Sequence, residues 1–462
     1  MPTTPDNPSK TRRLQVRLPR RPTSNMLDIP GEPGLPLIGQ TFEFLHNPLA
    51  YKRRMRARYG DVFYGRLFFK YGVVFVGPES AREILQDKQK NFSSRFGWDG
   101  AFAGLLDGGL FLRDFDEHLA HRRIMNVAFQ RNPMRGYMDV LNRHIEAGIA
   151  NWHRDPNLRM FPAIKQLTLN AAARVFVGLE IGRESATVNQ AFIDVIDGTV
   201  AVLPFAVPGM KLWAGLRGRQ YLETFVGQLV RERRRRPVEG QDMLSVLCRA
   251  VDEDGERFSD EEVIAHMIAI LAAAHDTTTG ALVNMVFELA RRPAWQDRLR
   301  AQIRAVGTLD LDYDDVGQLG DLDLVFREIL RLYPPISAIP RRTIEPCTVQ
   351  GTRLAANTIV FVNTDINHRL PEWWTRPDDF DPERFGPERA EHRRHSYLWL
   401  PFGGGAHRCI GARFAELNAR TFIYHLLSRY RLRVPPGYEP ELQYMPTTRP
   451  KRGLPMILER ID

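Results

Sequence analysis

Cysteine is scarce in this sequence, and long apolar runs are absent from it. The 462 residues include three cysteines, Cys248, Cys347 and Cys409, which are too few for a disulfide framework and typical of a reducing compartment. No uninterrupted apolar stretch is long enough to cross a bilayer. We therefore expect a soluble, cytoplasmic protein without a transmembrane segment. The 43% of hydrophobic residues can fill a sizeable core.

Positive charge is concentrated at the N-terminus. The formal net charge is +9, and the sequence predicts that residues 1–28 form a disordered basic tail. Before residue 25 a single acid, Asp6, faces six basic residues: Lys10, Arg12, Arg13, Arg17, Arg20 and Arg21. No zinc knuckle and no basic helix with interleaved aromatic residues accompanies them, so nucleic-acid binding is not indicated. Arginine and proline at 17–22 stand where an export signal would need an apolar run.

Apolar residues recur at helical spacing through most of the chain. This pattern predicts helices at 79–89, 113–131, 137–153, 161–178, 187–200, 215–236, 240–252, 260–291, 293–305, 321–333 and 410–429. Strand-like alternation predicts strands at 61–68 and 73–76, around a turn at Tyr71 and Gly72, and again within 339–364. Residues 371–402 show little periodicity, and a loop of this length inside a compact domain is usually functional. The pattern predicts a mainly α protein.

The strongest chemical signal is residues 402–411, FGGGAHRCIG. Three successive glycines allow the backbone to turn tightly and to approach a bulky planar group. Cys409 directly precedes a predicted helix, whose N-terminal amides favour a thiolate, and His407 and Arg408 add positive charge. These are the conditions for a sulfur that binds a metal. For the cysteine alone, a buried thiol in a glycine-rich turn explains the pattern equally well.

Two further motifs have ordinary structural explanations when each is taken alone. Glu328 and Arg331, three apart on a predicted helix, are typical of an exposed ion pair. A polar Asp-Thr-Thr-Thr run interrupts the apolar helix at 276–279, and side-chain hydrogen bonds to the backbone in a local bend would account for it. A third segment, 380–385, reads FDPERF.

Together these motifs resemble the cytochrome P-450 superfamily in order and spacing, over about residues 30–458. The family's cysteine loop, Phe-x-x-Gly-x-Arg/His-x-Cys-x-Gly, is matched position by position at Phe402, Gly405, His407, Cys409 and Gly411. The resemblance implies haem b with the Cys409 thiolate as its axial iron ligand, as the handling of dioxygen in this family requires. It also implies that His407, where the family commonly has Arg, hydrogen-bonds a haem propionate.

The resemblance assigns roles to the other two motifs. Glu328, Arg331 and Arg384 would form a buried structural triad, for which the planar guanidinium is suited. On the long helix Ala273, Asp276 and Thr277 match the distal pattern, although Ala274 replaces the common glycine. Thr277 would donate a hydrogen bond to the dioxygen substrate, and Asp276 would supply protons from solvent. His275 would point away, as a packing or solvent-facing residue.

Weaker matches extend the cofactor and substrate sites. His118 and Arg122, four apart on a helix, and Arg341 on a strand would face the propionates. Because side chains alternate along a strand, only one of Arg341 and Arg342 can point inward, and we favour Arg341. The expected substrate pocket comprises Trp98, Phe102, Leu105, Phe111, Ile336, Ala338, Met445 and Thr447. The expected lid comprises Val202, Leu203, Phe205, Val207 and Met210.

The resemblance implies a P-450 fold: residues 29–462 as one catalytic domain, mainly α, with a small β lobe built near 60–76, 340–364 and 440–459. The expected reaction inserts one oxygen atom of O2 into a lipophilic substrate, since most predicted pocket residues are apolar. Sterols, retinoids, terpenoids and fatty-acid-like molecules are the classes suggested. Because no flavin or iron–sulfur module is found in the chain, we expect electrons from a ferredoxin or flavodoxin with its NAD(P)H reductase. Such a partner would meet a basic surface of Arg408, Arg413 and Arg420.

Other functions are compatible with the sequence. Some relatives isomerise or dehydrate peroxides, but they tend to lack the distal acid and alcohol that this chain keeps at Asp276 and Thr277. A haem-binding sensor or carrier without turnover is a second alternative. An inactive interaction scaffold is a third, and failure to retain haem would favour it.

Overall fold

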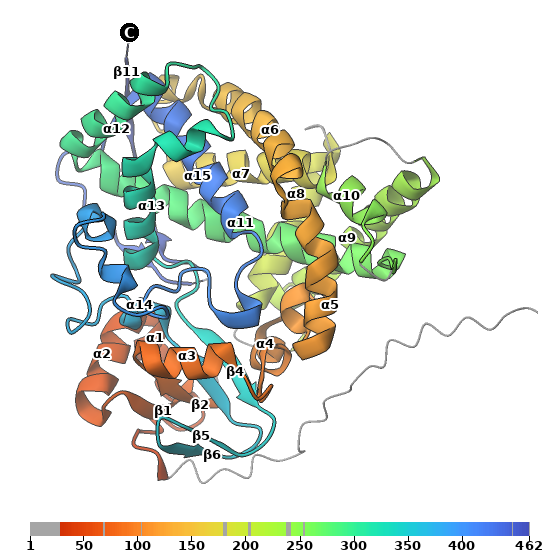
Figure 1. Ribbon diagram of the computed structural model, residues 1–462, viewed down its shortest axis with the longest axis vertical. Coiled ribbons are helices and arrows are strands. Elements are labelled where there is room, and N and C mark those ends of the chain that lie inside the picture. The colour runs from red at the N-terminus through yellow and green to blue at the C-terminus, as the bar shows by residue number, and fades with distance from the viewer. Residues whose placement is uncertain are drawn as a thin grey trace, which may run out of the picture.

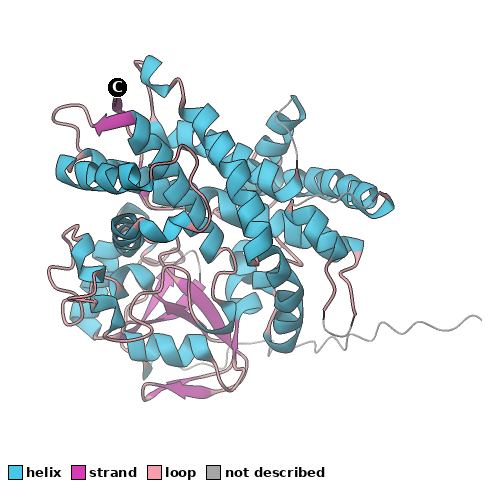
Figure 2. Ribbon diagram, turned by 45° about the horizontal axis from the view of Figure 1, so that its top comes forward, coloured by secondary structure: helices cyan, strands magenta, loops and turns pink. Residues whose placement is uncertain are grey.

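The computed structural model describes residues 28–67, 70–102, 104–178, 183–201, 205–236, 242–252, 255–445 and 447–461. Helices make up most of this part of the chain; most strands lie at one end of the molecule, and the last strand lies at the opposite end, beside the C-terminus (Figures 1 and 2). The predicted mainly α fold with a small β portion is confirmed. The predicted basic tail, residues 1–28, lies outside the described residues except for Asp28.

The helices are α1 (Thr41–His46), α2 (Pro48–Tyr59), α3 (Pro78–Gln86), α4 (Ser94–Phe102), α5 (Phe115–Asn126), α6 (Arg131–Ile149), α7 (Met160–Val177), α8 (Arg183–Thr199), α9 (Lys211–Arg235), α10 (Met243–Arg249), α11 (Asp260–Ala290), α12 (Pro293–Val306), α13 (Gly320–Leu332), α14 (Thr364–Asn367) and α15 (Ala412–Arg429). The predicted helices are present with shifted ends. Apolar periodicity missed α1, α2 and α4, where exposed and charged residues dilute the pattern.

The strands are β1 (Val62–Leu67), β2 (Lys70–Phe75), β3 (Phe92–Ser93), β4 (Ile339–Thr343), β5 (Cys347–Val349), β6 (Thr352–Leu354), β7 (Ile359–Val362), β8 (Tyr430–Arg433), β9 (Leu442–Gln443), β10 (Arg449–Pro450) and β11 (Ile457–Arg460). Five of them form one sheet in the order β1-β2-β7-β4-β3. The predicted turn at Tyr71 and Gly72 is wrong, because both residues pair within β2, opposite Arg66 and Gly65.

The C-terminal strands do not join this sheet, which corrects a second prediction. β9 pairs with β10, and β11 pairs with β8. The segment 440–459 therefore belongs to two small separate sheets rather than to the β lobe. Its strands are two to four residues long, and so short a pattern carries no information about its pairing partner.

Helix α11 runs through the centre of the molecule (Figure 1). It begins with a capping box, in which Ser259 accepts from the Glu262 N–H at 3.2 Å and Glu262 accepts from the Ser259 N–H at 2.9 Å. Acidic residues in the first turn suit the helix dipole. Most of its later residues are buried, so tertiary packing holds the polar run at 276–279 in helical conformation. The long helix is therefore a rigid wall for whatever lies beside it.

Residues 371–402 form the expected irregular segment. The triad of Glu328, Arg331 and Arg384 holds this segment in place. Arg331 binds both oxygens of Glu328, at 2.7 and 2.9 Å, and Arg384 Nε lies 3.2 Å from Glu328 Oε1. Arg331 also donates to the backbone oxygens of Pro377 at 2.6 Å and Asp379 at 3.0 Å. Side-chain donors thus replace the backbone ladder that an irregular segment lacks.

No helix among the described residues combines the length and the apolarity needed to span a bilayer.

Candidate active site

A cavity of about 490 Å³ lies between α11 and the loop that carries Cys409. Its wall is drawn from α4, α5, the end of α8, α11, the start of β4, and the loop and helix at 400–419. These segments are far apart in sequence, so the cavity exists only in the folded chain. Most of its lining is apolar, and its polar members fall into small groups.

The Cys409 loop turns through two glycines with left-handed backbone angles, Gly403 at φ 70° and Gly405 at φ 64°. The Cys409 N–H donates to Phe402 O at 2.8 Å, which closes the turn. A Cβ on Gly405 would lie 1.8 Å from Leu85 O of α3. Phe402 and Gly403 line the cavity, whereas Gly405 faces α3. Of the matched loop residues, Gly405 therefore does not line the cavity, and a glycine is needed there for the close approach to α3.

Cys409 opens onto the cavity while protein atoms enclose it on the other sides. Burial raises the pKa of its thiol, against the Gly411 N–H and the charges of Arg122 and Arg408, which lower it. In the chain without a bound group, the effect of burial on this pKa outweighs the effect of these local donors and charges. A metal cation bound to the sulfur would stabilise a thiolate, since coordination deprotonates a thiol.

Four basic side chains stand along one side of the cavity: His118, Arg122, Arg341 and His407. The His118 and His407 rings pack with centroids 3.9 Å apart, and burial lowers the pKa of His118 to about 4. His118 Nδ1 has no hydrogen-bond partner within the described structure. Arg341 is buried, and its Nη1 donates to Pro340 O at 2.8 Å.

This basic cluster lacks acidic partners. Within the part of the chain that the structure describes, no carboxylate lies within 4 Å of the nitrogens of Arg122 or Arg341. Burial lowers the pKa of Arg341 to about 10, and Asp114 and Asp87 offset this only in part. Buried cations without counter-charges are costly. The arrangement therefore fits a flat group with carboxylates on one edge and a metal at its centre, above Cys409.

The distal residues Ala273, Asp276 and Thr277 all lie in the cavity wall on α11. The Thr277 hydroxyl donates to Ala273 O at 2.8 Å, so its oxygen remains free to accept. Asp276 Oδ1 lies 3.5 Å from Lys165 Nζ and 3.3 Å from His275 Nδ1. His275 is 1% exposed, so it is a packing residue and not a solvent-facing one.

The apolar end of the cavity contains six of the eight expected pocket residues: Trp98, Phe102, Phe111, Ile336, Met445 and Thr447. Phe102 stacks on Trp98 with ring centroids 4.8 Å apart and meets Phe111 edge-on at 5.3 Å. This aromatic group forms one wall.

Two expected pocket residues do not line the cavity. Leu105 is fully buried and lies against Gly198 and Gly215, between α8 and α9. Leu106 and Leu110 face the cavity instead. Ala338, the residue immediately before β4, does not line the cavity, whereas Ile339 and Arg341 of β4 do.

The expected lid is also corrected. Val202 and Leu203 lie outside the described residues. Phe205, Val207 and Met210 are 65%, 45% and 42% exposed and do not line the cavity. Ile196, Thr199 and Val200, at the end of α8, line it instead. The sequence offered no signal for this, because both stretches are apolar.

Sequence reasoning also missed Ile270 and His266, which line the cavity from α11. They could have been found, since positions 266, 270, 273 and 277 follow one another at helical spacing on the face that carries Thr277. Arg420 is a further correction. It is buried and pairs with Asp323. Of the other two proposed surface arginines, Arg413 is exposed, and Arg408 is exposed but also lines the cavity.

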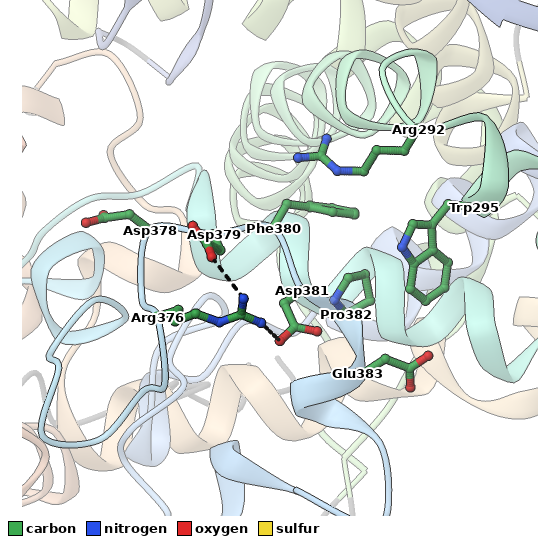
Figure 3. Close-up of a pocket in the computed structure, with 9 residues that line it drawn as sticks. All are labelled: Arg292, Trp295, Arg376, Asp378, Asp379, Phe380, Asp381, Pro382 and Glu383. Carbon is green, nitrogen blue, oxygen red and sulfur yellow. Dashed lines mark ion pairs between the residues drawn. The ribbon is translucent and has the colours of Figure 1, made fainter.

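A second hollow, of about 430 Å³, lies between α12 and the irregular segment (Figure 3). Arg376 lies 3.6 Å from Asp379 and 3.7 Å from Asp381 across it, and Arg292 stacks on Phe380 at 4.3 Å. Its carboxylates also have arginine partners outside the hollow, such as Arg389 for Asp381 and Arg298 for Glu383, so we assign no chemistry to the hollow.

Known proteins resemble the chain over nearly its whole length. A family profile described as cytochrome P450 matches residues 29–456. The chain is 39% identical to cytochrome P450 136 of Mycobacterium tuberculosis, over 95% of this chain and 89% of that protein. It is 30% identical to the pentalenene oxygenase of Streptomyces avermitilis, over 87% and 90%. The solved structure "Retinoic acid bound cyanobacterial CYP120A1" superposes with a TM-score of 0.86, at 26% identity, over 94% and 99%.

The fold and the family imply haem b with a cysteine thiolate as its axial ligand, and the cavity has the residues to receive such a group. The family and its named oxygenase relative imply oxidation by dioxygen. The chain therefore belongs to the cytochrome P450 family, as a monooxygenase.

Proposed function

We propose that Cys409 is the thiolate ligand and that the protein inserts one oxygen atom of O2 into a lipophilic substrate. The main supporting observation is that Cys409 and Thr277, 132 positions apart in the sequence, line one cavity whose wall is mostly apolar. When bound, the haem would activate dioxygen. Residues 29–462 would serve this reaction as one catalytic domain, with residues 1–28 as a basic tail.

The residues of the chain have separate tasks in this proposal. His118, Arg122, Arg341 and His407 would hold the haem carboxylates, and Glu328, Arg331 and Arg384 would fix the segment before the Cys409 loop. Asp276 would accept protons from solvent, with Lys165 beside it, and Thr277 would pass them to the oxygen substrate. Ala273 and Phe402, which both line the cavity, would pack against the haem.

The substrate class follows from the wall of the cavity. Trp98, Phe102, Phe111, Ile336 and Met445 offer apolar surface, and Thr447 adds one hydroxyl. A relative that oxidises pentalenene and a similar structure holding retinoic acid agree with a terpenoid or retinoid. Sterols and fatty-acid-like molecules of similar length belong to the same proposal.

Electrons would come from a ferredoxin or flavodoxin with its NAD(P)H reductase, in the cytoplasm, where three free cysteines are stable. Arg408 and half-exposed Arg413 are the proposed contacts for an acidic partner. Electrostatic steering predicts that R413E slows reduction and weakens its salt dependence. Unchanged rates and salt dependence would remove Arg413 from the partner site.

The reduced carbon-monoxide difference spectrum tests the ligation. The wild-type protein should show the thiolate signature, and C409S should lose it, whereas C347S, a partly exposed cysteine on β5, should keep it. A signature that survives C409S rejects the proposal.

Product analysis tests the reaction. Incorporation of labelled O2 into product supports a monooxygenase. Reduction without product would favour a sensor or carrier, and turnover of peroxides without electrons would favour an isomerase or dehydratase.

A further inference from the structure

Two buried histidines are joined beside the cavity. His121 Nδ1 of α5 lies 2.9 Å from His266 Nε2 of α11, and both rings are buried. Phe258 stacks on His121, with ring centroids 5.1 Å apart, and lies 4.8 Å from His266. Neither histidine belongs to the buried triad or to the basic cluster described above.

Glu262 decides which nitrogens carry hydrogen. Its carboxylate is held at the start of α11, and Oε1 lies 3.5 Å from His121 Nε2. A carboxylate here favours the hydrogen on His121 Nε2, so His121 Nδ1 must accept the hydrogen bond from His266 Nε2. His266 Nδ1 is then left as a bare acceptor. Burial, aided by Arg113, lowers the pKa of His121 to about 3, which keeps the pair neutral.

The position of His266 indicates a role for its unpaired Nδ1. His266 lines the cavity on the same face of α11 as Thr277. The two positions are eleven residues apart, which is about 16 Å along the helix axis. Nδ1 is buried and has no hydrogen-bond partner among the residues that the structure describes. An unpaired buried acceptor is costly unless something else completes it.

We propose that His266 recognises the substrate by accepting a hydrogen bond from its hydroxyl group. The substrate would be a lipophilic alcohol whose hydroxyl is held by His266 while its other end lies beside Thr277. This inference rests on the proposed function and narrows its substrate class. A carboxylate is disfavoured at this position, because the imidazole offers no hydrogen to it.

The test uses the haem-loaded protein and two probe pairs: retinol with retinyl methyl ether, and farnesol with farnesyl methyl ether. Each ether keeps the skeleton and the oxygen but has no hydrogen to donate. Spectral titration should show that the wild type binds each alcohol about tenfold more tightly than its ether.

Two variants test the roles of the two ring nitrogens of His266 separately. H266Q keeps a group that can reach His121 but removes the nitrogen on the Nδ1 side, so it should lose the preference. H266N keeps a polar atom on the Nδ1 side and should retain part of it. H144Q, at a buried histidine of α6 that binds Leu167 O at 3.3 Å, should keep the full preference.

Equal wild-type affinity within the pairs, no binding of either member, or an unchanged preference in H266Q would overturn the inference. The reduced carbon-monoxide spectrum of the same samples reports on the proposed function separately. If the thiolate signature is present without an alcohol preference, only the role of His266 fails. If the signature is absent, both fail.

Discussion

Arg384 reaches Glu328 across 56 residues of sequence and meets it at 3.2 Å, and neither side chain is accessible to solvent. Glu328 accepts from Arg331 and from the Asp381 N–H as well, at 2.8 Å for the latter. One carboxylate therefore connects α13 to the segment that leads to the Cys409 loop.

Glu328→Gln should lower the free energy of unfolding by about 3–5 kcal/mol, because it leaves buried Arg331 without a carboxylate partner and leaves Arg384 with Glu391 alone. Urea unfolding measures this. Arg53→Gln is the control, since the Arg53–Asp378 pair is exposed on both sides and should contribute about 1 kcal/mol or less. Equal effects of the two substitutions would show that the triad is not a structural tie.

Gly405→Ala should destabilise the protein by about 3 kcal/mol or more, because the new Cβ would overlap Leu85 O. Gly403→Ala has a similar positive φ, but its Cβ would meet nothing closer than 3.8 Å. It should cost only about 1–2 kcal/mol. The unfolding midpoints and haem contents of the two variants distinguish the effect of close approach from that of backbone strain. An equal loss of stability in both variants would contradict this account.

Arg341→Met should have opposite effects on the two forms of the protein. Removing a buried cation without an acidic partner should stabilise the cofactor-free chain. It should also accelerate haem loss, by roughly tenfold, because a charged hydrogen-bond donor to the cofactor is gone. Thermal unfolding and haem transfer to apomyoglobin measure the two effects. Arg342→Met, on the other face of β4, should change haem loss little.

Thr277→Ala should lower product formed per electron consumed by roughly tenfold or more, since it removes a hydroxyl from a residue of the cavity wall. The missing electrons should appear as hydrogen peroxide, formed from dioxygen with two electrons and two protons. Thr277→Ser keeps the hydroxyl and should retain most coupling. Coupling that is equal in the two variants would assign Thr277 a packing role only.

His368 should make the free energy of unfolding depend on pH. Burial lowers its pKa from 6.5 to about 3, and its Nε2 accepts from the Leu400 N–H at 2.8 Å. Between pH 6.5 and pH 3, His368 binds a proton in the unfolded chain but not in the folded one. The free energy of unfolding therefore falls as the pH falls, by up to about 1 kcal/mol per pH unit.

His368→Gln keeps an acceptor without a titrating group. Its unfolding free energy should therefore vary less between pH 6.5 and pH 3, as urea unfolding at several pH values would show. Parallel curves of unfolding free energy against pH for the variant and the wild type would exclude His368 as a source of the pH dependence.

The sequence alone determined the motifs whose chemistry depends on neighbours in the chain. Cys409 and its glycines lie within ten residues, and Asp276 and Thr277 are adjacent, so both motifs could be found in the sequence, and the resemblance to the P450 family assigned their expected roles. The same holds for α11, whose caps and apolar length are written in consecutive residues. The mainly α fold followed from periodicity of the same kind.

Tertiary structure decided what depends on residues far apart. It excluded Leu105 and Ala338 from the cavity, buried Arg420 against Asp323, and placed Gly405 against α3 rather than in the cavity wall. It also joined His121 to His266, which no spacing could predict. The physical reason is that apolar residues pack equally well on either side of a helix or loop, so only the folded arrangement chooses which side chains line a cavity.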